Sequence, residues 1–338
     1  DTGLRQTYRR FNYQPGKSQL ILITGTLKSS GTSGSGLTRG MGYGDDDNGF
    51  FLEDTEGTIN LIRRTNYTGT AVDNAVVQAS WNLDTMDGTG DSGITLDWTK
   101  SQIMLIDMEW LGVGRVRIGF VIDGIPYYCH QFVHSNNEAG VYMSTPNLPI
   151  RFHIENTAGA GAASTLEHIC CSVMSEGGEQ PTGISRYAST GTTAIACNTS
   201  GTIYALIGLR LKAANLDGAI RLTNISVSSD DANNYEWFLI FNPTLTAATE
   251  TWSDETNSVL QNGIAPAAGV SITAATGTYI TGGFIKGGKE TGSVSFELDT
   301  KQALGSSIAG TPDEVWLCVK PLGATNDFRG SITWNEYS

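Results

Sequence analysis

The stretch Ile103–Phe132 reads IMLIDMEWLGVGRVRIGFVIDGIPYYCHQF, and it decides the fold class. Two apolar-rich runs of strand length, Ile103–Leu111 and Ile125–Phe132, flank a run in which charged and apolar residues alternate, Arg115–Ile122. Alternation with a period of two is typical of a β-strand that has one buried face. Asp123-Gly124 is a favoured pair for a type I′ turn between two such strands. The stretch therefore predicts a three-stranded antiparallel meander.

Similar patterns recur on both sides of this meander. A chain with 41 glycines and only 16% charged residues suits many short strands joined by polar turns. The only modest helix candidate is Val72–Ser80, which is equally compatible with a strand. Further strands are predicted at Gly49–Glu53, Thr58–Arg64, Ile150–Glu155, Leu166–Met174, Thr202–Lys212, Ala219–Ser228, Tyr235–Phe241, Thr278–Ile285, Ser293–Leu298, Glu314–Lys320 and Ser331–Tyr337.

A boundary between two domains is expected near residue 180. The segment Gly177–Thr193 is rich in Gly, Ser and Thr, contains Pro181, and separates two regions that are dense in predicted strands. We therefore predict an all-β protein with two antiparallel β-sandwich or jelly-roll-like domains, residues 18–180 and 181–338, preceded by an N-terminal arm of residues 1–17.

The N-terminal segment differs in charge from the rest of the chain. Four basic residues against Asp1 give residues 1–17 a net charge of +3, whereas the whole chain carries −13. An ordinary terminal strand and an arm that docks on an acidic neighbouring subunit both remain open. The residues that such an arm would use for oligomer contacts are Arg5, Arg9, Arg10, Phe11 and Tyr13.

Overall composition argues against several classes of protein. A net charge of −13 lacks the basic footprint that nucleic-acid binding requires. No run approaches the roughly 20 apolar residues needed to span a membrane, so no membrane span is expected. Five cysteines without regular spacing predict buried free thiols, which suits assembly in a reducing cytoplasm, and not a disulfide framework.

Candidate metal ligands do not form a convincing site in the sequence. The acidic run Asp45–Asp47 begins like an EF-hand loop, but Gly49 and Phe50 occupy the fifth and sixth positions, where Asp or Asn and then Gly are required. We interpret the run as a solvated acidic loop. His130 and His134 are interpreted as surface or structural histidines. We expect no metal and no cofactor.

Leu105–Gly112 resembles the strand motif of the laminarinase-type glycoside hydrolases, a concanavalin-like jelly-roll family. That motif reads Glu-x-Asp-x-Glu followed by an aromatic residue, and Asp107, Glu109 and Trp110 match its last three positions. Leu105 stands where the nucleophile is required, and it cannot form a glycosyl–enzyme intermediate. The resemblance therefore implies a lectin-like sandwich without catalytic residues, in which Asp107, Glu109 and Trp110 are candidate ligand-binding residues.

A second resemblance covers roughly residues 10–180. The region is similar to a domain found in virion structural proteins of tailed phages and other large DNA viruses. No chemistry is assigned to these motifs, so the resemblance implies a capsid-surface, fibre or tail-associated component that oligomerises. The segments that carry it are Tyr13–Ser18, Gly49–Phe51, Ile62–Thr65, Ala71–Asp73, Trp110–Asp123 and Tyr142–Arg151.

Two functions from different classes are therefore expected. The first is a non-enzymatic bacteriophage or viral structural protein, exposed on the particle surface after assembly in the host cytoplasm. Its partners would be copies of itself, such as a trimer, and other virion proteins. The second is a carbohydrate-binding adhesin that recognises host surface glycans, with a degenerate glycoside hydrolase as its catalytic variant. A groove lined by Asp107, Glu109 and exposed tryptophans would favour the second.

Overall fold

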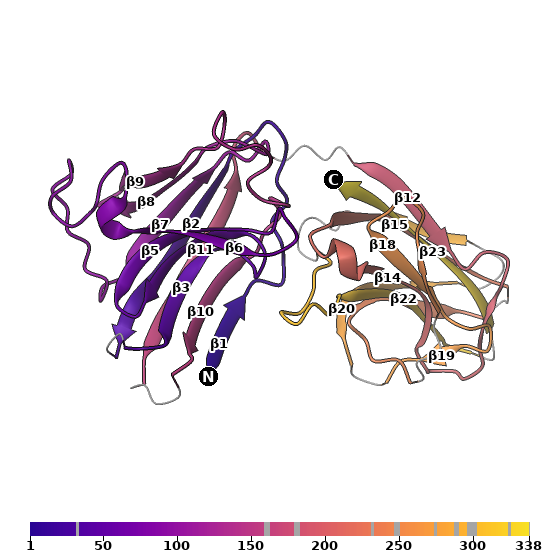
Figure 1. Cartoon of the computed structure of the whole chain (residues 1–338). Coiled ribbons are helices and arrows are strands. Elements are labelled where there is room, and N and C mark those ends of the chain that lie inside the picture. Colours follow the sequence, from indigo (N-terminus) through magenta and orange to yellow (C-terminus); the bar gives the residue numbers. More distant parts are fainter. Residues whose placement is uncertain are drawn as a thin grey trace. The chain divides into compact units, whose positions relative to one another are not determined.

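In the computed structural model the chain forms two compact units, Asp1–Gln180 and Pro181–Ser338, built from antiparallel β-sheets (Figure 1). The structure describes residues 1–31, 34–158, 163–178, 183–230, 233–246, 251–273, 276–286, 291–295, 303–323 and 326–337. Each unit has its own hydrophobic core and is described separately.

The first unit contains a six-stranded sheet and a five-stranded sheet. The six-stranded sheet has the order β1 (Thr2–Gln6), β10 (Ile150–Asn156), β3 (Leu37–Gly44), β4 (Gly49–Thr55), β5 (Thr58–Thr65) and β6 (Val72–Val77). The five-stranded sheet has the order β11 (Thr165–Ser175), β2 (Gln19–Ser30), β7 (Gln102–Met108), β8 (Val116–Ile122) and β9 (Ile125–Phe132). Within the helix candidate Val72–Ser80, residues Val72–Val77 form strand β6, and Gln78–Ser80 form a 3-10 turn.

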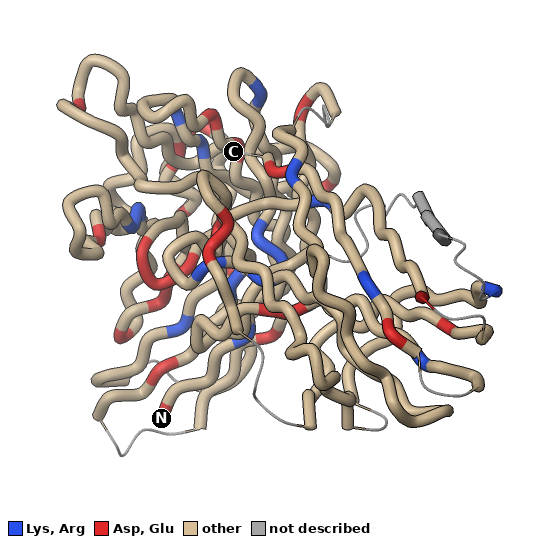
Figure 2. Tube along the Cα trace, turned by 90° about the vertical axis from the view of Figure 1, so that its right-hand side faces the viewer, with Lys and Arg blue, Asp and Glu red and all other residues tan. Residues whose placement is uncertain are grey.

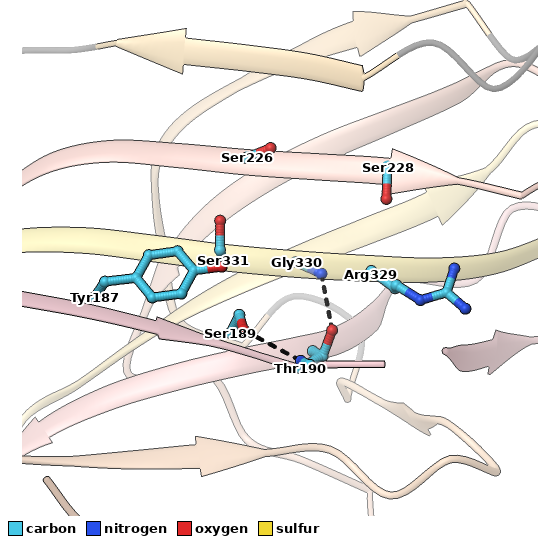
Figure 3. A pocket seen from close by; sticks show the side chains of 9 residues that line it. Tyr187, Ser189, Thr190, Ser226, Ser228, Arg329, Gly330 and Ser331 are labelled. Carbon is cyan, nitrogen blue, oxygen red and sulfur yellow. Dashed lines mark hydrogen bonds between the residues drawn. The ribbon is translucent and has the colours of Figure 1, made fainter. Parts of the chain in front are cut away.

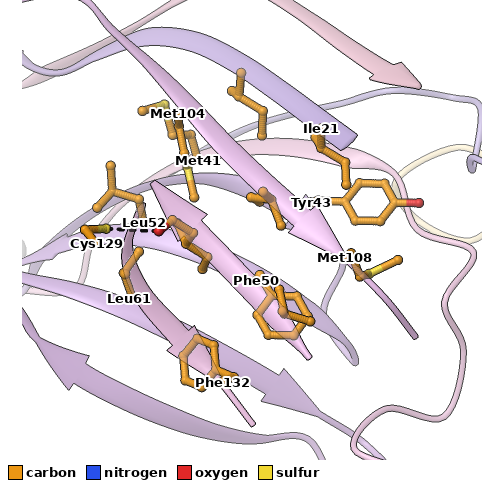
Figure 4. Packing of buried hydrophobic residues seen from close by; sticks show 14 of the residues in the cluster. Ile21, Met41, Tyr43, Phe50, Leu52, Leu61, Met104, Met108, Cys129 and Phe132 are labelled. Carbon is orange, nitrogen blue, oxygen red and sulfur yellow. Dashed lines mark hydrogen bonds between the residues drawn. The ribbon is translucent and has the colours of Figure 1, made fainter. Parts of the chain in front are cut away.

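The two sheets of the first unit pack face to face, because alternate residues of each point into one core. Ile21 and Met104 from the five-stranded sheet lie in the same buried cluster as Met41, Phe50 and Leu61 from the six-stranded sheet (Figure 4). Each of these side chains is fully buried. Burying an aliphatic or aromatic side chain contributes about 1.5–3 kcal/mol, so this interface is the main source of the unit's stability.

The predicted meander is confirmed. Strand β7 pairs with β8 and β8 with β9, all antiparallel, and the β8–β9 turn falls at Asp123-Gly124. Both turn residues have positive φ, 52° at Asp123 and 81° at Gly124, as a type I′ turn requires. The first strand is shorter than predicted, since it ends at Met108 and not at Leu111.

The second unit is also a sandwich. One sheet has the order β12 (Ile184–Ser189), β23 (Asn326–Tyr337), β15 (Ala219–Ser229) and β21 (Thr291–Ser295), with β13 (Ile195–Cys197) paired to β23. The other has the order β17 (Thr251–Asp254), β18 (Leu260–Ile264), β14 (Tyr204–Leu211), β22 (Glu314–Pro321), β16 (Tyr235–Phe241) and β20 (Thr278–Ile285), with β19 (Val270–Ser271) paired to β14. Their inner faces share a core that includes Ile225, Trp334 and Leu317. A 3-10 turn covers Ala213–Asn215.

The N-terminal segment is not a separate arm. Strand β1 pairs with β10 along its whole length, from Thr2 opposite Glu155 to Gln6 opposite Arg151. Tyr13 is 4% exposed and packs in the core, and Phe11 is partly buried against it. Strand β1 is thus an ordinary terminal strand, one of the two alternatives that the sequence left open, and Phe11 and Tyr13 pack within the first unit, whereas Tyr8 is 74% exposed.

No helix in the described part of the chain is long and apolar enough to cross a membrane.

Candidate functional site

The acidic residues of the laminarinase-like motif do not form a binding groove together. Asp107 lies on β7 and points away from the core, and its carboxylate accepts hydrogen bonds from the Arg117 guanidinium and from the Tyr128 hydroxyl. The Arg117 guanidinium also lies 4.2 Å from the centre of the Tyr128 ring. Since Asp107 is only 7% exposed and already paired, it has little capacity left for a ligand.

Glu109 and Trp110 lie beyond the end of β7. The Glu109 carboxylate is exposed, and its nearest cation is Arg115 at 3.8 Å. Trp110 packs against the core, edge-to-face with Tyr13 at a ring-centre distance of 5.8 Å. Asp107, by contrast, faces outward from the sheet, so the motif supplies no single surface that combines two acids with an aromatic platform.

The face that carries Asp107 is largely apolar. On the outer side of the five-stranded sheet, Leu20 and Leu22 of β2 pair with Asp107 and Leu105 of β7, and Thr24 pairs with Ile103. We call this surface the apolar face, defined by Leu20, Leu22, Ile103, Leu105 and Met174. Ile103 is 38% exposed and Met174 is 41% exposed. Leu105, by contrast, is only 3% exposed.

The basic residues predicted for oligomer contact have different surroundings. The Arg10 guanidinium forms an ion pair with Asp45 at 2.5 Å, and Arg9 lies 5.5 Å from the centre of the Phe11 ring. Arg5 is exposed at the outer strand β1. Contact of this segment with a neighbouring subunit stays a prediction.

The acidic run is only partly solvated, because Asp46 and Asp47 are exposed whereas Asp45 is buried. Asp45 is 8% exposed, and its carboxylate accepts hydrogen bonds from the backbone N–H groups of Asp47 and Asn48, both at 2.9 Å. Asp46 pairs with Arg151, which holds the pKa of the Asp46 carboxyl below its usual range. The interpretation as a solvated acidic loop therefore holds for Asp46 and Asp47 but not for Asp45, which also forms an ion pair with Arg10. Among the described residues no group of His, Cys, Asp and Glu is arranged to hold a metal ion.

The two histidines are structural. Desolvation by burial lowers the pKa of His130 to about 4, and its Nδ1 accepts a hydrogen bond from the Asn82 backbone N–H at 3.2 Å. The His134 ring stacks on Tyr142 at 3.8 Å, and burial lowers its pKa as well. The neutral form of both rings is therefore favoured in the folded protein.

A second surface, on the second unit, was not predicted. The outer side of the sheet β12-β23-β15 carries a polar hollow of about 210 Å³, which is lined by Tyr187, Ser189, Thr190, Gly191, Ser226, Ser228, Arg329, Gly330 and Ser331 (Figure 3). The sequence signal for it is the alternation of Ser with apolar residues in Ile225–Ser228. We call this surface the hydroxyl face.

Strand pairing aligns the hydroxyl groups of this face. Ser331 of β23 pairs with Ser189 of β12 on one side and with Ser226 of β15 on the other. All three point outward, because their neighbours Ala188, Ile332 and Val227 belong to the core. Neighbouring strands lie about 4.8 Å apart, so the serines form a short row across the sheet.

Along the described part of the trace, Lys and Arg positions are interspersed with Asp and Glu positions, between long uncharged stretches of the chain (Figure 2). Arg329, at the edge of the hydroxyl face, donates to both oxygens of the Asp230 carboxylate at 2.6 Å.

The sequence matches none of the models of known protein families with which it was compared. It also matches none of the curated proteins.

Proposed function

We propose that the chain is a non-enzymatic structural protein of a virus particle, exposed on the particle surface, which works through protein–protein interfaces that include contacts between its own copies. The resemblance of residues 10–180 to a virion domain motivates the viral assignment. The apolar face is the observation that supports the interface role.

The apolar face suits an interface better than a catalytic cleft. Ile103 and Met174 expose apolar side chains on the outside of the sheet. A bound partner would shield these side chains from water. The polar group at its centre, Asp107 with Arg117 and Tyr128, is internally paired, so a partner could cover it without leaving an unpaired charge.

Light scattering across a range of concentrations tests self-association. We expect the wild-type chain to form an oligomer and Ile103→Asp to shift it toward the monomer, because a buried unpaired carboxylate opposes contact. Leu322→Asp is the matched control, since Leu322 is a similarly exposed leucine of the second unit. A wild-type chain that remains monomeric at all concentrations would contradict the proposal.

The viral assignment has its own test. An antibody raised against the chain should decorate the surface of intact particles in negative-stain electron micrographs. Failure to label particles whose purified proteins include the chain would place it inside the particle and contradict surface exposure.

A further inference from the structure

We propose that the hydroxyl face of the second unit binds a neutral oligosaccharide that lies across β12, β23 and β15. This inference rests on the second unit alone and does not depend on the proposed viral role. Three properties of the face point to carbohydrate: an exposed aromatic ring, uncommitted hydroxyl groups, and the absence of a free charge at the described lining residues.

Tyr187 supplies the aromatic ring. It lies on β12 at the edge of the hollow and is 62% exposed (Figure 3). A tyrosine offers an apolar ring face together with a polar tip, so it can stack on the C–H face of a sugar while its hydroxyl stays hydrated. The tryptophans Trp237, Trp316 and Trp334 of the second unit are buried and cannot offer such a ring.

Uncommitted hydroxyl groups provide the hydrogen bonds. Those of Ser226, Ser228 and Ser331 make no hydrogen bond to any other described residue. Each can donate one hydrogen bond and accept others, as the hydroxyls of a sugar can. Thr190 and Ser189 are already used, because their hydroxyls accept the backbone N–H groups of Gly330 and Gly191 at 3.2 Å. The hydrogen bonds of Thr190 and Ser189 to the backbone therefore stabilise the surface on which the other three hydroxyl groups lie.

The charge of the face selects a neutral ligand. Among the described lining residues Arg329 is the only cation, and Asp230 neutralises it through two contacts of 2.6 Å. Its guanidinium also donates to the Thr192 carbonyl at 3.3 Å. A phosphate, sialic acid or uronic acid would have to compete with Asp230 and would meet a chain of net charge −13. Neutral hexose chains carry no such penalty.

The hollow is a shallow depression on a sheet, so a chain lying along it fits better than a buried chain end. Three strands about 4.8 Å apart, with outward residues about 6.6 Å apart along each strand, present hydroxyl groups over roughly 10 Å, which is longer than one sugar ring. Ser189, Ser331 and Ser226 span three strands in register. An oligosaccharide should therefore bind more tightly than its monosaccharide.

Titration calorimetry with linear neutral hexasaccharides (cello-, malto-, laminari- and chitohexaose) tests the proposal on the full chain. We expect at least one to bind, and Tyr187→Ala to weaken binding about tenfold. Tyr279→Ala is the matched control, because Tyr279 is a 45% exposed tyrosine on a strand of the other sheet, and it should leave affinity unchanged. Weakening by both variants alike would overturn the assignment to this face.

A second variant distinguishes binding from folding. Ser226→Ala combined with Ser331→Ala removes two hydroxyl groups that no described residue uses, so the thermal unfolding temperature should not change while affinity falls. No binding of any of the four hexasaccharides tighter than about 1 mM would overturn the proposal. Tighter binding of a sulfated or uronic-acid chain, in parallel assays, would overturn the assignment to neutral sugars.

Discussion

At the scale of single residues, the most consequential contact of the first unit is a fully buried ion pair. The Arg39 guanidinium donates to the Asp54 carboxylate at 2.7 and 3.2 Å, and neither side chain is exposed. Arg39 also donates to the Ser30 carbonyl at 3.1 Å, and Lys28 lies 3.4 Å from Asp54. Because Ser30 and Lys28 belong to β2, the pair joins the two sheets at one end of the sandwich.

Removing the Asp54 carboxylate should destabilise the first unit strongly. Asp54→Ala leaves the Arg39 guanidinium buried without its counter-ion, a change that costs about 3–5 kcal/mol. Asp73→Ala is the control, because Asp73 forms a comparable two-point contact with Arg64 at the surface, and exposed pairs contribute at most about 1 kcal/mol. Urea denaturation measures the free energy of unfolding of both variants. An equal decrease in the two variants would contradict the larger contribution of the buried ion pair.

At the scale of elements, the sequence located most strands from alternation, and Tyr235–Phe241 and Thr278–Ile285 were predicted with their observed bounds. Strand β3 was missed, because Leu37–Gly44 contains three glycines and glycine disfavours strands. Its glycines make room for neighbours. A Cβ at Gly42 would lie 2.1 Å from the Phe50 carbonyl oxygen and 2.6 Å from the Phe51 ring. Close packing against an adjacent strand leaves no signal in the local sequence from which the strand could be predicted.

Gly42→Ala should therefore destabilise the six-stranded sheet. The added methyl group forces β3 and β4 apart, and overpacking of this kind costs about 1–3 kcal/mol. Gly34→Ala is the control, since a Cβ there meets nothing within 4 Å. Thermal unfolding followed by circular dichroism should show a lower midpoint for Gly42→Ala alone, and a midpoint equal to that of the wild type would contradict the close contact.

At the scale of the whole molecule, the all-β class followed from composition and turn signals, whereas the candidate binding surface did not. Acids at alternate positions of one strand are expected on one side of the sheet, but the sequence alone does not show that Arg117 from the next strand pairs with Asp107. The hydroxyl face depends on β12, β23 and β15, which lie far apart along the chain. Only strand pairing brings Ser189, Ser226 and Ser331 together.

Each unit should fold alone, because each has a core of its own. We expect two separately produced fragments, residues 1–180 and residues 181–338, each to unfold cooperatively on heating. Trp334→Ala empties a fully buried site of the second core and should lower the unfolding temperature of the second fragment, with a cost of about 3–5 kcal/mol. Calorimetry measures both fragments, and a fragment without a cooperative transition would show that its core is incomplete.

Of the five cysteines, three are buried, Cys171 is partly buried and Cys170 is exposed. Cys129, Cys197 and Cys318 are buried, and desolvation raises the pKa of each thiol, to about 12 for Cys197, so these sulfurs stay protonated and unreactive. Cys170 is exposed and pairs with Thr24 on the outer side of the five-stranded sheet, beside the apolar face. A thiol-reactive fluorophore would therefore attach preferentially at Cys170, and its emission colour would report directly whether the native assembly covers that side of the sheet.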